Sequence, residues 1–208
     1  MNNEHQSVEY AKAAVRKGSV EPKYVKKQCR EFLRIAEGKD RKYDINWGIV
    51  KKIDAVLKLA IMPKGLKAGK TLYECSEGYQ WLLYVSSLAV VYRDNPKKRR
   101  YETVLLEIAR KNFKTFTVGT MFILLFILEP PLSKFYSVAP DGSLSREVKE
   151  AISDTLRMSP RLYEYMGKKR FRILRDYIEF TLNGSKYYPL NYSTSRMDGK
   201  LPNVYLAD

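Results

Sequence analysis

The sequence has few of the residues that build metal centres, disulfide frameworks and histidine-based active sites. Its 208 residues include one histidine, His5, and two cysteines, Cys29 and Cys75. Neither cysteine lies in a CxxC pair or near other potential ligands, so no zinc site is predicted. His5 stands in a polar N-terminal segment, which argues against a catalytic triad. We expect both cysteines to be buried free thiols in a reducing compartment.

A long hydrophobic run is also absent. The longest, from Val118 to Leu128, is about half of the roughly 20 residues that a membrane-spanning helix requires. The first residues, MNNEHQSVEYAKAAVRKG, are polar and have no apolar core of the kind found in signal peptides. We therefore expect a soluble cytoplasmic protein with no membrane partner.

Positive charge is abundant. The chain has 38 Lys and Arg residues against 23 Asp and Glu residues, which gives a net charge of +15. Such a balance favours nucleic acid, nucleotides or an acidic membrane surface as partners. With 45% hydrophobic residues, the chain can form one globular domain that buries about 70% of its unfolded surface.

The most informative stretch runs from Val104 to Leu128 and reads VLLEIARKNFKTFTVGTMFILLFIL. Val104 to Ile108 predicts a strand, the basic residues after it predict a turn, and Thr117 to Leu128 predicts a buried helix. Lys114 and Thr115 stand where this helix should begin. At that position backbone N–H groups lack acceptors within the helix and the helix dipole is positive. This is a potential phosphate site.

The pattern GxxxxGK[ST] of nucleotide-binding loops is matched only in part. Lys114 and Thr115 fit its last two positions, but Ile108 and Phe113 stand where it has glycines. Arg110, Lys111 and the intervening Asn112 make the turn basic and polar. A bulky residue such as Phe113 is costly if the turn needs positive φ there. The alternative reading is a solvated strand-to-helix turn without a ligand.

The flanking segments predict an α/β fold. Strands and helices alternate after the central stretch, which is typical of βαβ units and a mainly parallel sheet. Helices are expected at 24–36, 49–60, 76–92 and near 144–156, and strands at 135–139, within 170–192 and at 204–207. The last strand leads into Asp208. In phosphate-binding sheets an aspartate at this place helps to hold magnesium.

Gln80 stands at the beginning of the helix predicted from Ser76. A glutamine amide can make paired hydrogen bonds with the edge of adenine. A surface or capping role is the alternative for this side chain.

Taken in order, these segments resemble the N-terminal ATPase domain of the large terminase subunit of tailed bacteriophages, the motor that packages DNA into the prohead. The matching segments are GYQWLLY, LLEIARKNFKT, YSVAPDGSLSREVKEAI and DGKLPNVYLAD. The resemblance implies a three-layer P-loop NTPase fold of the RecA-like (ASCE) class, with a mainly parallel sheet. Residues 1–72 would form a helical N-terminal region and residues 73–208 a partial ATPase core.

The resemblance also implies a site for ATP and Mg²⁺. Lys114 would contact the β- and γ-phosphates, while Thr115 and Asp208 would hold magnesium. Arg110 would stabilise charge on the transferred phosphate, and Gln80 would read adenine. The implied ATP-binding set is Gln80, Arg110, Lys111, Asn112, Phe113, Lys114 and Thr115.

The implied partners are double-stranded phage DNA, the small terminase subunit, the portal and further copies in a ring, all in the host bacterial cytoplasm. In the family a catalytic glutamate follows the aspartate that matches Asp208, and a further strand and a nuclease domain come later. This sequence does not reach them. We therefore expect a truncated reading frame or a fragment that is catalytically incomplete, with an unfilled slot at the centre of its sheet.

A function of another class fits the same composition. The net charge of +15 and the basic, aromatic segment 163–192 are also expected of a non-enzymatic nucleic-acid-binding protein.

Overall fold

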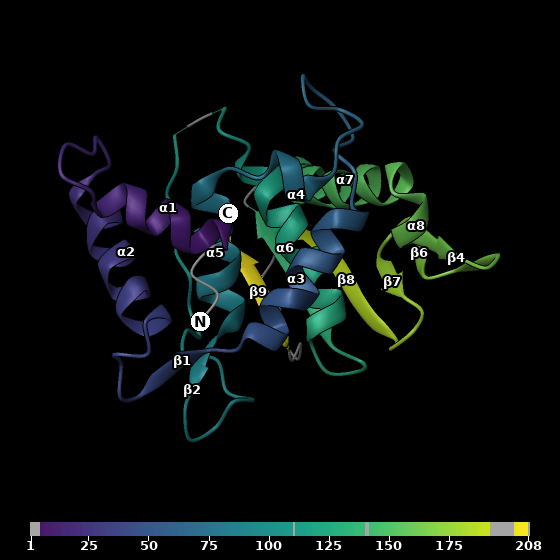
Figure 1. Cartoon of the computed structure of the whole chain (residues 1–208). Helices are drawn as coiled ribbons and strands as arrows, with labels where there is room; N and C mark the ends of the chain where they lie inside the picture. Colours follow the sequence, from purple (N-terminus) through teal and green to yellow (C-terminus); the bar gives the residue numbers. More distant parts are fainter. Residues whose placement is uncertain (1–4, 110, 140–141, 192–201, 208) are drawn as a thin grey trace. The chain divides into compact units, whose positions relative to one another are not determined.

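The computed structural model (Figure 1) describes residues 5–109, 111–139, 142–191 and 202–207. These residues form two compact units. The first consists of Met1–Ala55 and Ser76–Glu107, and the second of Val56–Cys75 and Ile108–Asp208. The division into 1–72 and 73–208 stays a prediction.

The first unit is mainly helical. Its helices are α1 (Gln6–Val15), α2 (Lys23–Ala36), the larger part of α3 (Trp47–Leu59) and α5 (Gly78–Ala89). Helices α2 and α3 lie where the apolar periodicity predicts them. Each helix buries its apolar side, which includes Cys29 and Phe32 in α2 and Ile53 in α3.

The helix predicted to reach residue 92 ends earlier. Helix α5 stops at Ala89, and β2 (Val90–Tyr92) pairs antiparallel with β1 (Tyr43–Ile45). The prediction was wrong over these three residues because the two β-branched residues, Val90 and Val91, find a partner strand about 45 residues earlier in the chain. Local periodicity contains no signal of that partner.

His5 stands in a polar stretch of sequence, yet it is buried with 6% of its surface exposed. Its Nδ1 accepts a hydrogen bond from the Ser7 N–H (3.2 Å), and its Nε2 lies 3.1 Å from Asp54 Oδ1. The ring also packs edge-on against Trp81. The Ser7 hydroxyl oxygen lies 2.8 Å from His5 Nδ1, but Ser7 has no exposed surface, so a substrate could not reach it. The side chains of His5, Ser7 and Asp54 therefore hold the start of α1 in place.

The second unit contains a five-stranded mixed sheet in the order β6-β7-β8-β3-β9. Strands β8 (Ser185–Asn191), β3 (Lys134–Ala139) and β9 (Val204–Ala207) are parallel. Strands β6 (Phe171–Ile173) and β7 (Ile178–Phe180) continue the sheet antiparallel. The chain is therefore a mixed α/β protein, and β3 and β9 lie within one residue of the predicted strands.

Helices of the second unit are α4 (Leu72–Cys75), α6 (Lys114–Leu128), α7 (Gly142–Met158) and α8 (Pro160–Tyr163), and a small antiparallel pair joins β4 (Glu164–Tyr165) to β5 (Lys168–Lys169). The core is aromatic: Phe126 packs edge-on against both Phe135 and Phe171. Gly119 of α6 faces α7 so closely that a Cβ there would lie 3.2 Å from the Ala151 Cβ.

The prediction of a strand from Val104 to Ile108 is wrong. This segment has no regular secondary structure, and Leu105 is 88% exposed. A strand forms only where another strand pairs with its backbone. Within the described part of the chain, β9 stands at the edge of the sheet beside β3, and no strand pairs with 104–108. The apolar run thus lies outside the sheet.

Both cysteines are buried and free, as expected. Burial raises the pKa of the Cys29 thiol to about 11, which keeps it protonated and unreactive at neutral pH. Among the described residues, no helix is long and apolar enough to cross a membrane.

Candidate functional site

The candidate site is the turn that leads into α6. The helix begins at Lys114, where the sequence predicts its start, and Thr117 N–H donates the first helical hydrogen bond to Phe113 O at 2.8 Å. Lys114 and Thr115 therefore occupy the first turn. The first N–H groups of an α-helix have no acceptor within the helix and carry partial positive charge.

The backbone of the turn is left-handed at two residues. Lys111 has φ +67° and Phe113 has φ +57°. Phe113 is also 62% exposed, so its packing offsets little of the cost of this conformation, about 1 kcal/mol. A left-handed residue directly before a right-handed helix is a backbone arrangement that can turn successive N–H groups toward an anion.

The side chains of the turn are accessible to solvent. Lys111, Asn112 and Lys114 are exposed and Thr115 is half-buried, whereas Thr117, one turn into the helix, is fully buried. Asn112 braces the turn because its Nδ2 donates to Ala109 O at 3.2 Å. Arg110 lies outside the described residues.

The start of α6 lies toward the end of the sheet where the C-termini of the parallel strands are. The five residues 129–133 join α6 to β3, and Phe126, near the end of the helix, packs against Phe135 near the start of the strand at 5.2 Å. A helix connected and packed in this way runs back along the sheet. Lys114 thus lies toward the same end of the sheet as Ala139 and Ala207, the last residues of β3 and β9.

Asp208, the predicted second magnesium ligand, lies outside the described residues. Of the predicted pair only Thr115 is described. Among the described residues there is no group of three or more His, Cys, Asp or Glu side chains that could hold a metal ion.

Gln80 belongs to the first unit and takes part in a capping box at the start of α5. Its Oε1 accepts a hydrogen bond from the Glu77 N–H at 2.8 Å, and the side chain is 5% exposed. These contacts correspond to the capping alternative. Reading of adenine by this amide would require that hydrogen bond to be exchanged.

Sequence reasoning missed the left-handed backbone at Lys111. The pattern GxxxxGK[ST] marks only its glycine positions as candidates for positive φ, and Lys111 is not among them. The positive φ at Phe113 could be anticipated, because the pattern has a glycine at that position.

Comparison with known proteins gives a structural relative. No family model matches the sequence, and no curated protein matches it. Among solved structures, the crystal structure of the large terminase of bacteriophage HK97 is similar, with a TM-score of 0.58 and 17% sequence identity over 76% of this chain. The matched part covers 30% of that terminase chain. At this identity the likeness concerns the fold, and the chain has a terminase-like α/β fold.

Proposed function

We propose that this chain is part of the ATPase domain of a phage large terminase, a motor for DNA packaging, and that the turn at Lys111–Thr115 binds the phosphates of ATP. The carrying observation is the strained turn, with Phe113 left-handed directly before Lys114 and Thr115 at a helix start. The terminase-like fold supports it. The finer fold assignment, a RecA-like P-loop NTPase, belongs to the same proposal.

Each residue of the turn has a role in this proposal. The Lys114 ammonium contacts the outer phosphates, because Lys supplies a mobile point charge, and the Thr115 hydroxyl holds magnesium together with Asp208. Backbone N–H groups of Lys111, Asn112 and Phe113 surround the inner phosphate oxygens. Arg110 stabilises charge on the transferred phosphate, and Gln80 gives up its capping hydrogen bond when it binds adenine.

The partners follow from the same likeness. The structural relative is a large terminase of a bacteriophage. We extend to this chain double-stranded DNA as the substrate of translocation, a small terminase subunit and portal as partners, a ring of copies as the working assembly, and the host cytoplasm as the location.

The test is thermal stabilisation by Mg²⁺ and ATP. A ligand at 100 times its Kd adds about 2.7 kcal/mol to the free energy of unfolding, which raises Tm by roughly 5–10 °C in a chain of this size. Lys114→Ala should abolish the rise. Lys168→Ala, which removes an equal charge from an exposed residue of β5, should retain it. The proposal is wrong if the wild-type Tm does not respond to Mg²⁺ and ATP.

A non-enzymatic nucleic-acid-binding protein is the second candidate. It is favoured by a basic stripe on α2, where Lys23, Lys27 and Arg30 are exposed at helical spacing and have no ion-pair partner among the described residues. This candidate predicts DNA binding that weakens steeply with salt and no change of Tm with Mg²⁺ and ATP.

A further inference from the structure

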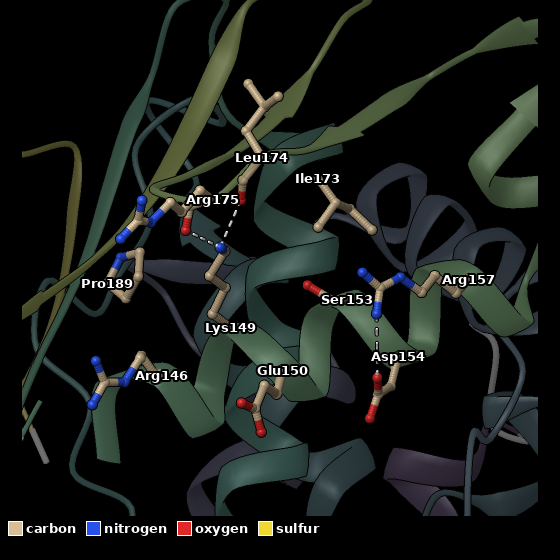
Figure 2. A pocket seen from close by; sticks show the side chains of 10 residues that line it. All are labelled: Arg146, Lys149, Glu150, Ser153, Asp154, Arg157, Ile173, Leu174, Arg175 and Pro189. Carbon is tan, nitrogen blue, oxygen red and sulfur yellow. Dashed lines mark hydrogen bonds and ion pairs between the residues drawn. The ribbon is translucent and has the colours of Figure 1, made fainter. Parts of the chain in front are cut away.

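A second basic site lies in a hollow of about 360 Å³ within the second unit. Figure 2 shows the hollow between α7, the end of β6 with the turn after it, and Pro189 of β8. It shares no residue with the turn before α6. A site here therefore stands or falls independently of the proposed ATP site.

The α7 side of the hollow follows from helical spacing. Arg146, Lys149, Ser153 and Arg157 succeed each other at intervals of three or four residues, which places them along one side of the helix. Val148, Ile152 and Leu156 form the other side and are buried. Packing of that side on the core fixes the basic side chains in the wall of the hollow.

The charges in the hollow are unbalanced. Four cationic side chains (Arg146, Lys149, Arg157 and Arg175) line it with two carboxylates, Glu150 and Asp154. Asp154 is already paired, with Lys64 Nζ at 2.8 Å and Arg157 Nη1 at 4.0 Å. Arg146 and Arg175 have no ion-pair partner within the described ranges. The excess is positive.

Lys149 is held in place by neutral groups. Its Nζ donates to Leu174 O at 2.6 Å and to Arg175 O at 2.5 Å, as the dashed lines in Figure 2 show. An ammonium has three N–H donors, so one remains. Burial lowers the pKa of Lys149, which is the effect of placing a cation where neither water nor a contacting carboxylate compensates it fully.

We propose that this hollow is a binding site for a phosphate group, the chemistry that a nucleic-acid backbone and free phosphate compounds share. Phosphate fits because its oxygens point in several directions and each can accept hydrogen bonds from a different donor. Arg146 and Arg175 approach from α7 and from the turn after β6, and each guanidinium presents a planar fork of N–H donors. Lys149, whose Nζ is bonded to the Leu174 and Arg175 carbonyls, supplies a fixed charge where α7 meets this turn.

The test compares two double variants of equal charge. Arg146→Gln with Arg175→Gln removes the two unpaired guanidinium groups of the hollow. Arg41→Gln with Arg161→Gln removes two exposed arginines outside it. None of these four side chains has an ion pair among the described residues, so both proteins should keep the wild-type Tm. Lys149 is left intact because it fixes the turn.

Each protein is measured in two ways. Anisotropy of a short fluorescein-labelled DNA duplex gives the affinity for a phosphate backbone, and Tm in sodium phosphate against sodium chloride at equal ionic strength gives the response to free phosphate. For a backbone site, the hollow variant should bind DNA roughly tenfold more weakly than the control variant, and its log–log salt slope should be lower by about 1–2.

A site for free phosphate gives a different supporting result. Phosphate then raises the Tm of the wild type and of the control variant but not of the hollow variant, while the two variants bind DNA equally. Equal DNA affinities together with equal phosphate responses would overturn the proposal.

Discussion

Phe113 adopts a backbone conformation that glycine adopts at no steric cost. Its φ is +57° and its ring is largely exposed. Phe113→Gly should relieve the strain, and the greater freedom of glycine in the unfolded chain should offset part of the gain. The expected net change is a rise of about 0.5–1 kcal/mol in the free energy of unfolding, measured by urea denaturation.

A matched control separates this effect from a general effect of glycine. Lys27 lies in the interior of α2 and is exposed, so Lys27→Gly should lose about 1 kcal/mol by helix propensity. A loss of about 1 kcal/mol with Phe113→Gly as well would contradict a strained, left-handed backbone at Phe113.

Asp40 is a buried carboxylate with a pH-dependent role in stability. It is 6% exposed, accepts hydrogen bonds from the N–H groups of Lys42 and Tyr43, and pairs with Arg34 at 2.7 Å. Burial alone would raise the pKa of Asp40, but these N–H groups and the Arg34 charge outweigh it and hold the pKa below its ordinary value. The ionised form thus stabilises the folded state.

The sign of the pH effect follows from linkage. Because the pKa of Asp40 is lower in the folded state than in the unfolded state, its contribution is complete above the unfolded pKa of about 4 and is lost as pH falls through the folded value. Asp40→Asn should cost about 2 kcal/mol at pH 7 and progressively less in acid. A difference between variant and wild type that stays constant from pH 7 to pH 3 would contradict this role.

At the scale of elements, the contact between α6 and α7 depends on Gly119. A Cβ at this position would lie 3.2 Å from the Ala151 Cβ and 3.5 Å from the Ile152 N, so a large side chain must push the helices apart. Gly119→Leu should lose about 3 kcal/mol of the free energy of unfolding, the upper range for overpacking. Met121→Leu, a conservative change at a half-buried position of the same helix, should cost less than about 1.5 kcal/mol.

Elements that depend on local pattern could be predicted, and those that depend on a distant partner could not. The periodicity of α2 and the long apolar run of α6 are contained in one segment each, and both helices form where predicted. Val104 to Ile108 has the composition of a strand, but no strand among the described residues pairs with it. His5 is polar by local sequence and is buried because Asp54 and Trp81 enclose it.

The same distinction applies to the two candidate sites. The adjacent Lys114 and Thr115 before an apolar helix are visible in the sequence, and the helix does begin there. The hollow beside α7 was missed, although Arg146, Lys149 and Arg157 share a helix side, because the turn at Leu174 and Arg175 that completes it comes from another segment.

At the scale of the whole molecule, the net charge of +15 attracts any polyanion. Binding of DNA by itself therefore supports both candidate functions, and only a measurement resolved along the chain distinguishes a phosphate site from general attraction. The left-handed backbone at Lys111 and Phe113, directly before α6, marks the segment in which such a measurement should be made.

Amide hydrogen exchange with and without Mg²⁺ and ATP is the most direct measurement. Phosphate oxygens that accept hydrogen bonds from the turn should slow exchange in the segment from Lys111 to Thr117, and exchange in α2 should not change. Lys114→Ala should remove the protection. Binding of ATP without slower exchange in this segment, or no binding at all, would contradict the assignment of the turn before α6 as a nucleotide phosphate site.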